Sequence, residues 1–204
     1  MDAIALQGRH VRLEPLEAKH AQGLADASAG GGELYRWSPV PQGIAAAEAY
    51  VAKALVMRDT GSAVPFATVR VSDGVVIGST RFWLMERWGW PEGHARLSEA
   101  RWDGCEIGHT WLTSDAVRTA ANTEAKLLML AHAFEQWRVL RVNLCTDARN
   151  ERSAAAIQRL GAKLDGKLRS HRMAADFVPR DSLWFSILRE EWVDVKRGLQ
   201  ARLG

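Results

Sequence analysis

The chain has 204 residues, of which 47% are hydrophobic and 25% are charged, and its net charge at pH 7 is +3. This composition is typical of a globular protein that buries one sizeable core, so we expect a single domain over residues 1–204. No stretch approaches the roughly 20 apolar residues that cross a bilayer, and charges stand where a signal peptide needs an apolar run, so we expect no membrane contact and a cytoplasmic location.

The two cysteines and the balance of charges exclude further classes of site. Cys105 and Cys145 belong to no cluster with metal-ligand spacing, so no metal site is predicted. Both are expected to be free thiols, because a structural disulfide is unusual in a reducing cytosol. The 27 Lys and Arg are nearly matched by 24 Asp and Glu, and no basic run stands out, so nucleic acid is not the expected partner.

The first half of the chain is predicted to contain strands and two helices. Residues 10–16 alternate apolar and polar side chains as a half-buried strand does, and residues 17–29 then favour a helix that ends at three glycines. An alanine-rich helix is predicted over residues 45–58. Residues 64–71 and 75–85 are rich in β-branched and aromatic side chains and flank an Asp-Gly turn, which predicts an antiparallel hairpin.

The second half predicts a β-α-β-α run followed by further elements. The run comprises a strand at 105–113, a helix at 120–137, a strand at 141–146 and a helix at 151–160. Two more strands at 163–173 and 181–188 and a polar helix at 190–203 follow. Both helices of the run carry an apolar stripe that can cover one face of a sheet.

Four segments in this order resemble the GNAT superfamily of N-acetyltransferases, most closely the branch that includes the ribosomal-protein-alanine N-acetyltransferases. They are EIGHTWL at 106–112, NTEAKLLMLAHAF at 122–134, RVNLCTDARNERSAAAIQRLGA at 141–162 and SILREEW at 186–192. The resemblance implies an α/β fold with a mixed, mostly antiparallel sheet of about six or seven strands flanked by helices. It also implies acetyl-CoA as cosubstrate, and it allows a homodimer.

The resemblance places the coenzyme A pyrophosphate at the start of the helix at 120–137. The first amides of a helix lack intrahelical partners and its dipole is positive there, which suits an anion. The residues that it implies at this turn are Arg118, Thr119, Ala120, Ala121, Asn122 and Thr123. The family's pattern of Gln or Arg, two residues, Gly, one residue, and Gly or Ala is altered here to Val117, Ala120 and Asn122. Alanine suits the turn if no positive φ is needed at Ala120.

Four further residues are implied to meet the pantetheine arm and the thioester. The backbone of Leu112 and Thr113 matches the positions that bond the arm and hold the carbonyl, although an ordinary core strand would have the same residues. Asn150 matches a pantetheine contact but is equally a plain helix N-cap. Ser153 is implied to approach the thiol, and it is the candidate to protonate the leaving thiolate because Ile157 stands where many family members have a tyrosine acid.

Glu106 is the candidate base, since the resemblance puts a glutamate here facing the acceptor amine, directly or through water. A salt-bridged or solvated strand residue is the alternative interpretation. Period-two counting puts His109 on the opposite face of the strand, where a packed histidine is expected. Residues 86–104 form a long loop with Trp88, Trp90, His94 and Trp102, which is either part of the acceptor wall or an idle insertion.

The resemblance implies direct transfer of acetyl from acetyl-CoA to a neutral amine. An α-amine with a pKa of about 7.7–8.0 needs less help to lose its proton than a lysine, so a protein N-terminus or a small-molecule α-amine is the expected acceptor. Two alternatives stay open at this point. The altered phosphate turn is compatible with a catalytically impaired acyl-CoA-binding module, and the positive net charge with a ribosome-associated or nucleic-acid-associated binding protein.

Overall fold

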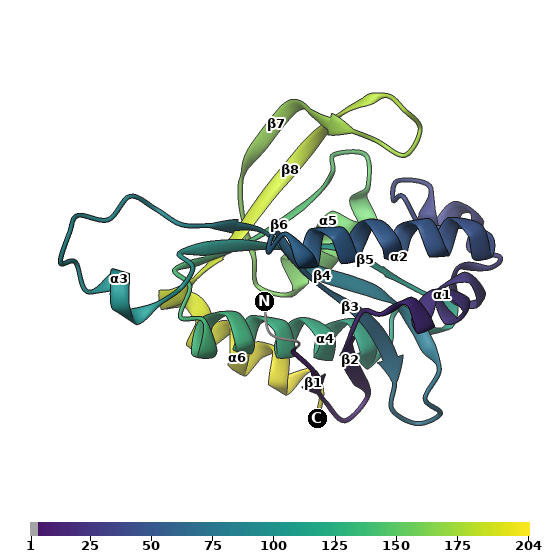
Figure 1. Cartoon of the computed structure of the whole chain (residues 1–204), viewed down its shortest axis with the longest axis horizontal. Helices are drawn as coiled ribbons and strands as arrows, with labels where there is room; N and C mark the ends of the chain where they lie inside the picture. The colour runs from purple at the N-terminus through teal and green to yellow at the C-terminus, as the bar shows by residue number, and fades with distance from the viewer. Residues whose placement is uncertain (1–3) are drawn as a thin grey trace.

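The computed structural model describes residues 4–204 and has one eight-stranded sheet with helices on both faces (Figure 1). The strands lie in the order β1-β2-β3-β4-β5-β6-β8-β7, and every neighbouring pair is antiparallel except the parallel pair β5–β6. Their bounds are β1 Leu6–Gln7, β2 Val11–Pro15, β3 Ala63–Arg70, β4 Val76–Glu86, β5 Gly104–Leu112, β6 Arg141–Asp147, β7 Lys163–Met173 and β8 Pro179–Leu188. The predicted mixed, mostly antiparallel sheet is confirmed, and the strand beyond the predicted number is β1, whose two residues are too few to show a period.

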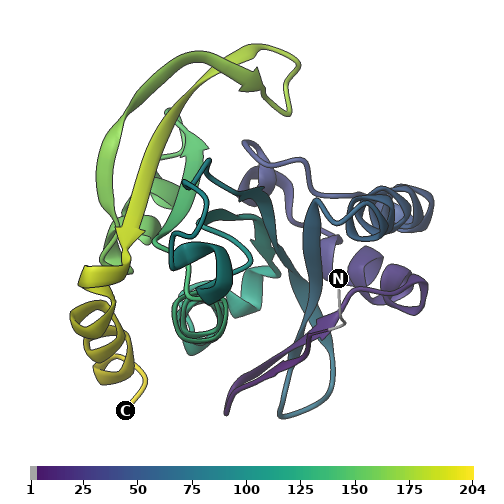
Figure 2. The same ribbon diagram turned by 60° about the vertical axis from the view of Figure 1, so that its left-hand side comes forward.

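The helices divide between the two faces of the sheet, as Figure 2 shows from the side. Their bounds are α1 Ala21–Ser28, α2 Gly43–Asp59, α3 Arg96–Glu99, α4 Ala120–Ala131, α5 Glu151–Arg159 and α6 Trp192–Ala201. Helices α1 and α2 pack on each other and on β3 and β4, whereas α4 packs against α6 and β2 on the other face. The helix predicted over 120–137 changes at His132 into a five-residue π-helix that ends at Gln136. The helix predicted over 17–29 begins with a separate 3-10 turn at Ala18–His20.

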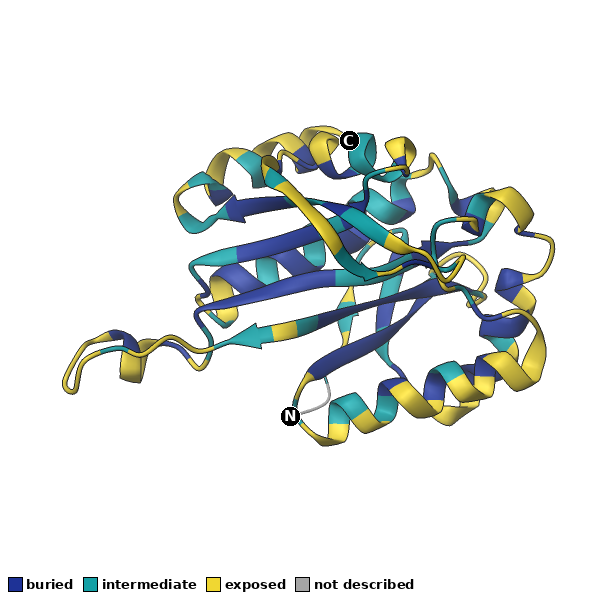
Figure 3. Ribbon diagram, turned by 90° about the horizontal axis from the view of Figure 1, so that it is seen from above, coloured by how far each residue is buried: buried dark blue, intermediate teal, exposed yellow. Residues whose placement is uncertain are grey.

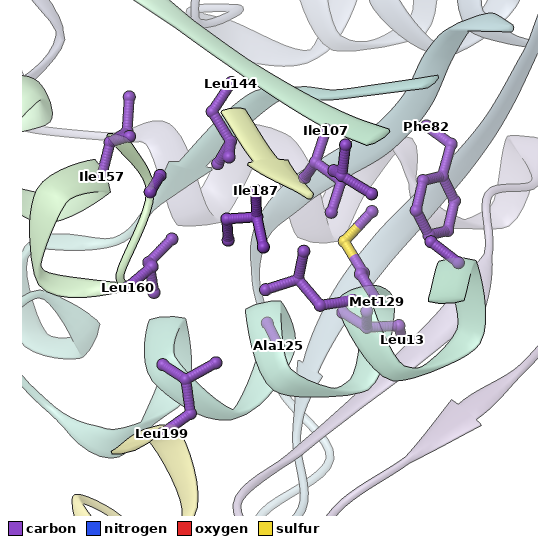
Figure 4. Packing of buried hydrophobic residues seen from close by; sticks show 14 of the residues in the cluster. Leu13, Phe82, Ile107, Ala125, Met129, Leu144, Ile157, Leu160, Ile187 and Leu199 are labelled. Carbon is purple, nitrogen blue, oxygen red and sulfur yellow. The ribbon is translucent and has the colours of Figure 1, made fainter. Parts of the chain in front are cut away.

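Two buried clusters hold the helices to the sheet. The larger one joins the sheet to α4, α5 and α6, and Figure 4 shows Leu13, Phe82, Met129 and Ile187 converging in it. The smaller one lies under α1 and α2 and includes the fully buried Leu24. Figure 3 shows buried residues along the central strands and exposed residues on the outer sides of the helices, the pattern that the apolar stripes predict. Both faces of the sheet are therefore covered.

A buried carboxylate fastens the N-terminal strands to α4. Glu124 accepts hydrogen bonds from the backbone amides of Arg9, His10 and Val11 at 2.8, 2.6 and 2.7 Å. The backbone at Gly8 passes so close that a Cβ there would lie 2.4 Å from the Glu124 carboxyl carbon. One side chain thus supplies the hydrogen-bond acceptor for three backbone amides of this turn.

We expect Glu124→Ala to lower the free energy of unfolding by roughly 3 kcal/mol, because it leaves three amides without their charged acceptor. Glu124→Gln retains one accepting oxygen and should lose less. Urea denaturation of both variants beside the wild type measures the difference. Losses of under about 0.5 kcal/mol in both, the level of an ordinary surface substitution, would contradict this role.

The loop between β4 and β5 projects from the body of the molecule and is organised from within (Figure 1). Asp103 is fully buried at its base and accepts from the Trp88 amide and the Trp90 indole, both at 2.9 Å. The guanidinium of Arg96, in α3, adds an ion pair at 3.0 Å. The polar groups of this loop thus serve its own structure.

Candidate active site

A cavity opens in the sheet where β5 and β6 separate. These parallel strands pair only from Gly104 with Arg141 to Glu106 with Asn143. Beyond that point both strands, together with α4, α5 and the hairpin of β7 and β8, line a cavity of about 760 Å³. Within residues 4–204, β5–β6 is the one parallel pair of the sheet and it pairs at three positions, so the sheet is open beyond Glu106, where a cavity can hold a ligand.

A β-bulge in β5 overturns the expectation for His109. Arg81 pairs with Gly108 while Ser79 pairs with Trp111, so β5 carries one extra residue, and His109 has a φ of 52°. The bulge breaks the period-two count, and His109 lines the same cavity as Glu106. Burial first, and then the positive charge of Arg81, lowers the pKa of His109 to about 3.

Glu106 is 1% exposed and lines the cavity, where it forms an ion pair with Arg172 of β7 at 3.0 Å. Burial raises the pKa of its carboxyl group, and the hydrogen bonds and charge of Arg172 oppose that rise. A Cβ at Gly108 would lie 2.5 Å from the Trp83 indole nitrogen and 3.0 Å from Glu106 Oε1, so glycine is required beside the carboxylate. The contacts of Glu106 are compatible with both interpretations, a catalytic base and a salt-bridged strand residue.

The turn before α4 has its positive φ at Arg118, with a value of 65°, and not at Ala120, which is the first helical residue. The alanine at the altered position is therefore free of strain. Thr119 caps the helix by accepting from the Ala121 amide at 3.2 Å and donating to the Ala116 carbonyl at 2.7 Å. Of the six residues predicted at this turn, four line the cavity: Arg118, Thr119, Asn122 and Thr123. Ala120 and Ala121 face a smaller neighbouring depression.

The two residues predicted at the end of β5 are placed differently. Leu112 lines the cavity, and its carbonyl accepts from the Tyr35 hydroxyl at 3.0 Å. Thr113 is outside the lining, and its amide donates to the Ile77 carbonyl at 2.8 Å. The Thr113 amide is thus already engaged, and Leu112 is the one of the pair placed to meet a ligand.

The start of α5 brings both predicted residues to the cavity. Asn150 is the N-cap, and its side-chain oxygen accepts from the Ser153 amide at 3.0 Å. Ser153 also lines the cavity, and so does Ile157 at the position of the absent tyrosine. Asn150 is therefore both a cap and a cavity residue, so the two interpretations of it are compatible.

Positive charge dominates the lining. Its cationic side chains are Arg118, Lys126, Arg152, Arg159, Arg172, Arg180 and Arg202, and Glu106 is the one carboxylate among the described residues that line it. Within residues 4–204, five of these arginines have no carboxylate within ion-pair distance: Arg118, Arg152, Arg159, Arg180 and Arg202. A cavity of this kind is complementary to a polyanion.

Sequence reasoning missed several of the lining residues. Tyr35 and Trp37 reach the cavity from the segment between α1 and α2, and Arg172 and Arg180 reach it from opposite strands of the β7–β8 hairpin. No motif marks these positions. Lys126 had a signal, because it follows Asn122 by one helical turn and is a charged residue within an apolar stretch.

Further sequence-based expectations concern the loop after β4, the two cysteines, metal ions and membrane spans. None of the residues 87–103 lines the cavity, so the interpretation of this loop as part of the acceptor wall is wrong. Cys105 and Cys145 are free, and burial raises the pKa of both thiols. Residues 4–204 contain no cluster of His, Cys, Asp and Glu that could hold a metal ion. In the same part of the chain, every helix is too short or too polar to span a membrane.

Solved structures share this fold. A GCN5-related N-acetyltransferase from Brucella melitensis matches with a TM-score of 0.85 and 27% identity over 100% of this chain and 87% of that chain. RimJ of Mycobacterium smegmatis, in complex with CoA-disulfide, matches with a TM-score of 0.77 over 98% of this chain and 93% of that chain, and its 19% identity shows the fold alone. The open sheet with its separated β5 and β6 is thus an acetyltransferase fold.

Residues 10–163 match the acetyltransferase (GNAT) domain, and the chain belongs to this family of acyltransferases. The resemblance seen in the sequence is confirmed. A relative from Bacillus subtilis (strain 168), named "Putative ribosomal N-acetyltransferase YdaF", is 30% identical over 87 residues. That match covers 43% of this chain and 46% of the relative, so the chain aligns with less than half of that protein's length.

Proposed function

We propose that this protein transfers acetyl from acetyl-CoA to an α-amine, at a protein N-terminus or on a small molecule. The observation that carries the proposal is the cavity between β5 and β6, which has the N-terminus of α4, a surplus of unpaired arginines and a buried carboxylate in its lining. Coenzyme A is a polyanion with a long neutral arm, and this lining offers cations and amides for the first and uncharged walls for the second.

The binding roles follow the position of each residue along the cavity. Arg118 and the amides at the start of α4 would hold the pyrophosphate, and Asn122 and Thr123 are close to it on the helix. Leu112 and Asn150 would flank the pantetheine arm from β5 and α5. The strain-free Ala120 favours this function over an impaired binding module, because the altered turn has its positive φ at another residue.

The chemical roles fall to Glu106 and Ser153. As a neutral amine nitrogen attacks the thioester carbonyl, Glu106 accepts the proton that the amine loses, directly or through water, and the new C–N bond forms. The C–S bond then breaks, Ser153 donates its hydroxyl proton to the departing thiolate, and the serine regains a proton from solvent water. A raised pKa suits Glu106 as a base, since a catalytic pKa nearer the working pH is more effective. Nothing in this sequence of steps needs a covalent enzyme intermediate.

The α-amine is favoured as acceptor by the charges around the base. Arg172 and Arg180 flank Glu106, and a positive surrounding lowers the pKa of a bound ammonium group, which promotes the neutral, reactive form. An α-amine already has a pKa of about 7.7–8.0, so a modest lowering suffices. The name of the B. subtilis relative, a ribosomal N-acetyltransferase, supports a protein N-terminus among the α-amines. A homodimer and a cytoplasmic location stay predictions from the sequence.

The cofactor role of Asn150 is tested by calorimetric titration with acetyl-CoA. We expect Asn150→Ala to weaken binding about tenfold, the factor that 1.4 kcal/mol represents, because a side-chain contact in the cavity is lost. Alanine also removes the helix cap, at a cost of about 1 kcal/mol, so Asn150→Ser serves as control because serine keeps a capping oxygen.

Serine should restore stability without restoring affinity if the amide side chain meets the ligand. Recovery of both by serine would show that Asn150 acts as a cap alone. Wild-type protein with no measurable affinity for acetyl-CoA would overturn the proposed function itself. Tight binding without thiol release on any amine or peptide would favour the binding module instead.

A further inference from the structure

The part of the cavity around Glu106 contains buried hydrogen-bond donors that are unpaired within residues 4–204. The Nε of Arg180 and the Nε of Arg81 are each buried without a hydrogen-bond partner within residues 4–204, whereas the Trp83 indole beside them hydrogen-bonds to Glu106. Arg180 lines the cavity, and Arg81 pairs in the β4–β5 ladder with Gly108, which also lines the cavity. Buried donors are normally satisfied, so two such groups in one region point to a ligand with hydrogen-bond acceptors.

The charges of the same region have the same sign. Arg81 is 2% exposed, and within residues 4–204 its guanidinium forms one hydrogen bond, to the Met57 sulfur at 3.5 Å, and lies over the Tyr50 ring at 5.1 Å from the centroid. Arg180 has a single weak contact, to the Cys145 sulfur at 3.9 Å. Neither arginine forms an ion pair within residues 4–204. Arg81 is buried and Arg180 is half-buried, and a positive charge withdrawn from water without an anion is costly, so a bound anion would relieve this cost.

The two carboxylates near Arg180 are already held by other arginines: Asp147 pairs with Arg149 at 2.7 Å, and Glu106 pairs with Arg172. Glu106 is already held by both guanidinium nitrogens of Arg172, at 3.4 and 3.0 Å, and Arg172 stacks over the Trp83 ring at 4.5 Å. Arg172 and Arg180 face each other across the β7–β8 pair, so the paired and the unpaired arginine stand side by side. Figure 2 shows this hairpin extending beyond the rest of the sheet and curving over it. Arg180 is therefore the arginine that is free to bind a second carboxylate.

We propose that the acceptor carries a carboxylate close to its α-amine and that Arg180 binds this carboxylate while Glu106 faces the amine. This inference rests on the proposed function and narrows it to an anionic class of acceptor. Two sources share the chemistry: a peptide N-terminus with Asp or Glu as its second residue, and a free amino acid. Arg180 is a specificity-determining residue in this arrangement, because a planar guanidinium with several free N–H groups matches a carboxylate.

The test is calorimetric titration of the complex with coenzyme A, which needs no turnover. The probes are Ser-Asp-Ala-Ala-amide, Ser-Asn-Ala-Ala-amide and Ser-Lys-Ala-Ala-amide, together with glycine and glycinamide. We expect the wild type to bind the aspartyl peptide, glycine or both at least about tenfold more tightly than the matching amide, a factor equal to 1.4 kcal/mol. A preference confined to the peptides identifies an N-terminus, and one confined to glycine identifies an amino acid.

Arg180→Gln should reduce that preference to about twofold or less, which is under half of the 1.4 kcal/mol of a tenfold factor. Arg169→Gln is the matched control, because Arg169 is an exposed arginine on the same hairpin and outside the cavity. Thermal unfolding of both variants checks that they fold. Equal wild-type affinity for acidic and amide probes, or a preference that survives in Arg180→Gln, would overturn the inference. Those results would leave the proposed function standing, since coenzyme A binding and thiol release are measured separately.

Discussion

Glu106→Gln should lower kcat by about 100-fold or more, the smaller end of what general acid–base catalysis contributes, with little change in acetyl-CoA affinity. The amide cannot accept the proton of the attacking amine, but it has nearly the size of the carboxylate and leaves the cavity intact. Steady-state thiol release measures kcat, and titration with acetyl-CoA measures the affinity. An unchanged kcat would remove Glu106 from the chemical step.

The ion pair with Arg172 requires a control, because Glu106→Gln also leaves that guanidinium without its partner. If the orphaned charge alone caused the loss, the double variant Glu106→Gln with Arg172→Gln would recover activity, whereas loss of a base persists in it. Glu86→Gln is the matched carboxylate control, since Glu86 ends the neighbouring strand β4 and is outside the cavity.

The pH profile distinguishes the base from a structural ion pair. Burial, opposed by Arg172, leaves the pKa of Glu106 above its ordinary value of 4.5, so the wild-type kcat/KM should rise with pH through that raised pKa. A general base works only when it is ionised, so the acidic limb of the profile belongs to Glu106 and should disappear in the glutamine variant. A structural role would lower the whole profile and leave its shape.

The period of apolar side chains predicted most of the helices and strands, because this period depends on which face of each element is buried. The strands and the longer helices from β2 to α6 follow alternation or helical spacing, whereas their arrangement in one mixed sheet came from the family resemblance and the four-residue α3 was not predicted. The site depends on departures from these periods. One extra residue at His109 moves that side chain to the cavity, and no composition signal marks the insertion in EIGHTWL.

Long-range pairing accounts for the other missed residues. Arg172 is 66 positions from Glu106 in the sequence, and it meets Glu106 only because β8 pairs with β6 and carries β7 beyond it. Residues taken from the family motifs were placed better, since Asn150 and Ser153 both reach the cavity. The motif transfer was weakest at Thr113, whose amide is committed to Ile77 in β4. Local patterns thus position the scaffold, and the charges of the site come from contacts across the sheet.

Lys126 is a buried amine in the lining of the cavity, and its burial lowers the stability of the protein. It is 4% exposed, with hydrogen bonds to the hydroxyls of Thr110 at 2.5 Å and Thr80 at 3.2 Å, and no carboxylate pairs with it within residues 4–204. Burial lowers the pKa of its amine from 10.5 to about 7. At 1.36 kcal/mol per pKa unit, this separation corresponds to roughly 4 kcal/mol of lost stability at pH 7.

Lys126→Met should therefore raise the free energy of unfolding at pH 7 by about 2–3 kcal/mol, after allowance for the lost hydrogen bonds at about 1 kcal/mol or slightly more. Thr80 and Thr110 remain partners of each other at 2.8 Å, so the substitution leaves neither hydroxyl alone. The gain has a definite pH dependence. The pKa of Lys126 is lowered in the folded state. Above pH 10.5 the amine is neutral in both the folded and the unfolded wild type, so burial carries no charge penalty there. As the pH falls from 10.5 towards 7, the wild type loses stability relative to the methionine variant.

Urea denaturation of wild type and Lys126→Met at pH 7 and pH 10 measures this dependence, and the difference between the two proteins should shrink at the higher pH. Lys126→Arg is the opposing control, because guanidinium stays charged at both pH values and should destabilise at both. Equal stability of wild type and methionine variant at pH 7 would show that the amine is not penalised. A stabilised variant with weaker acetyl-CoA binding would indicate that the amine is retained for a bound anion. Burial disfavours the charged form of Lys126, and an anion in the cavity favours it.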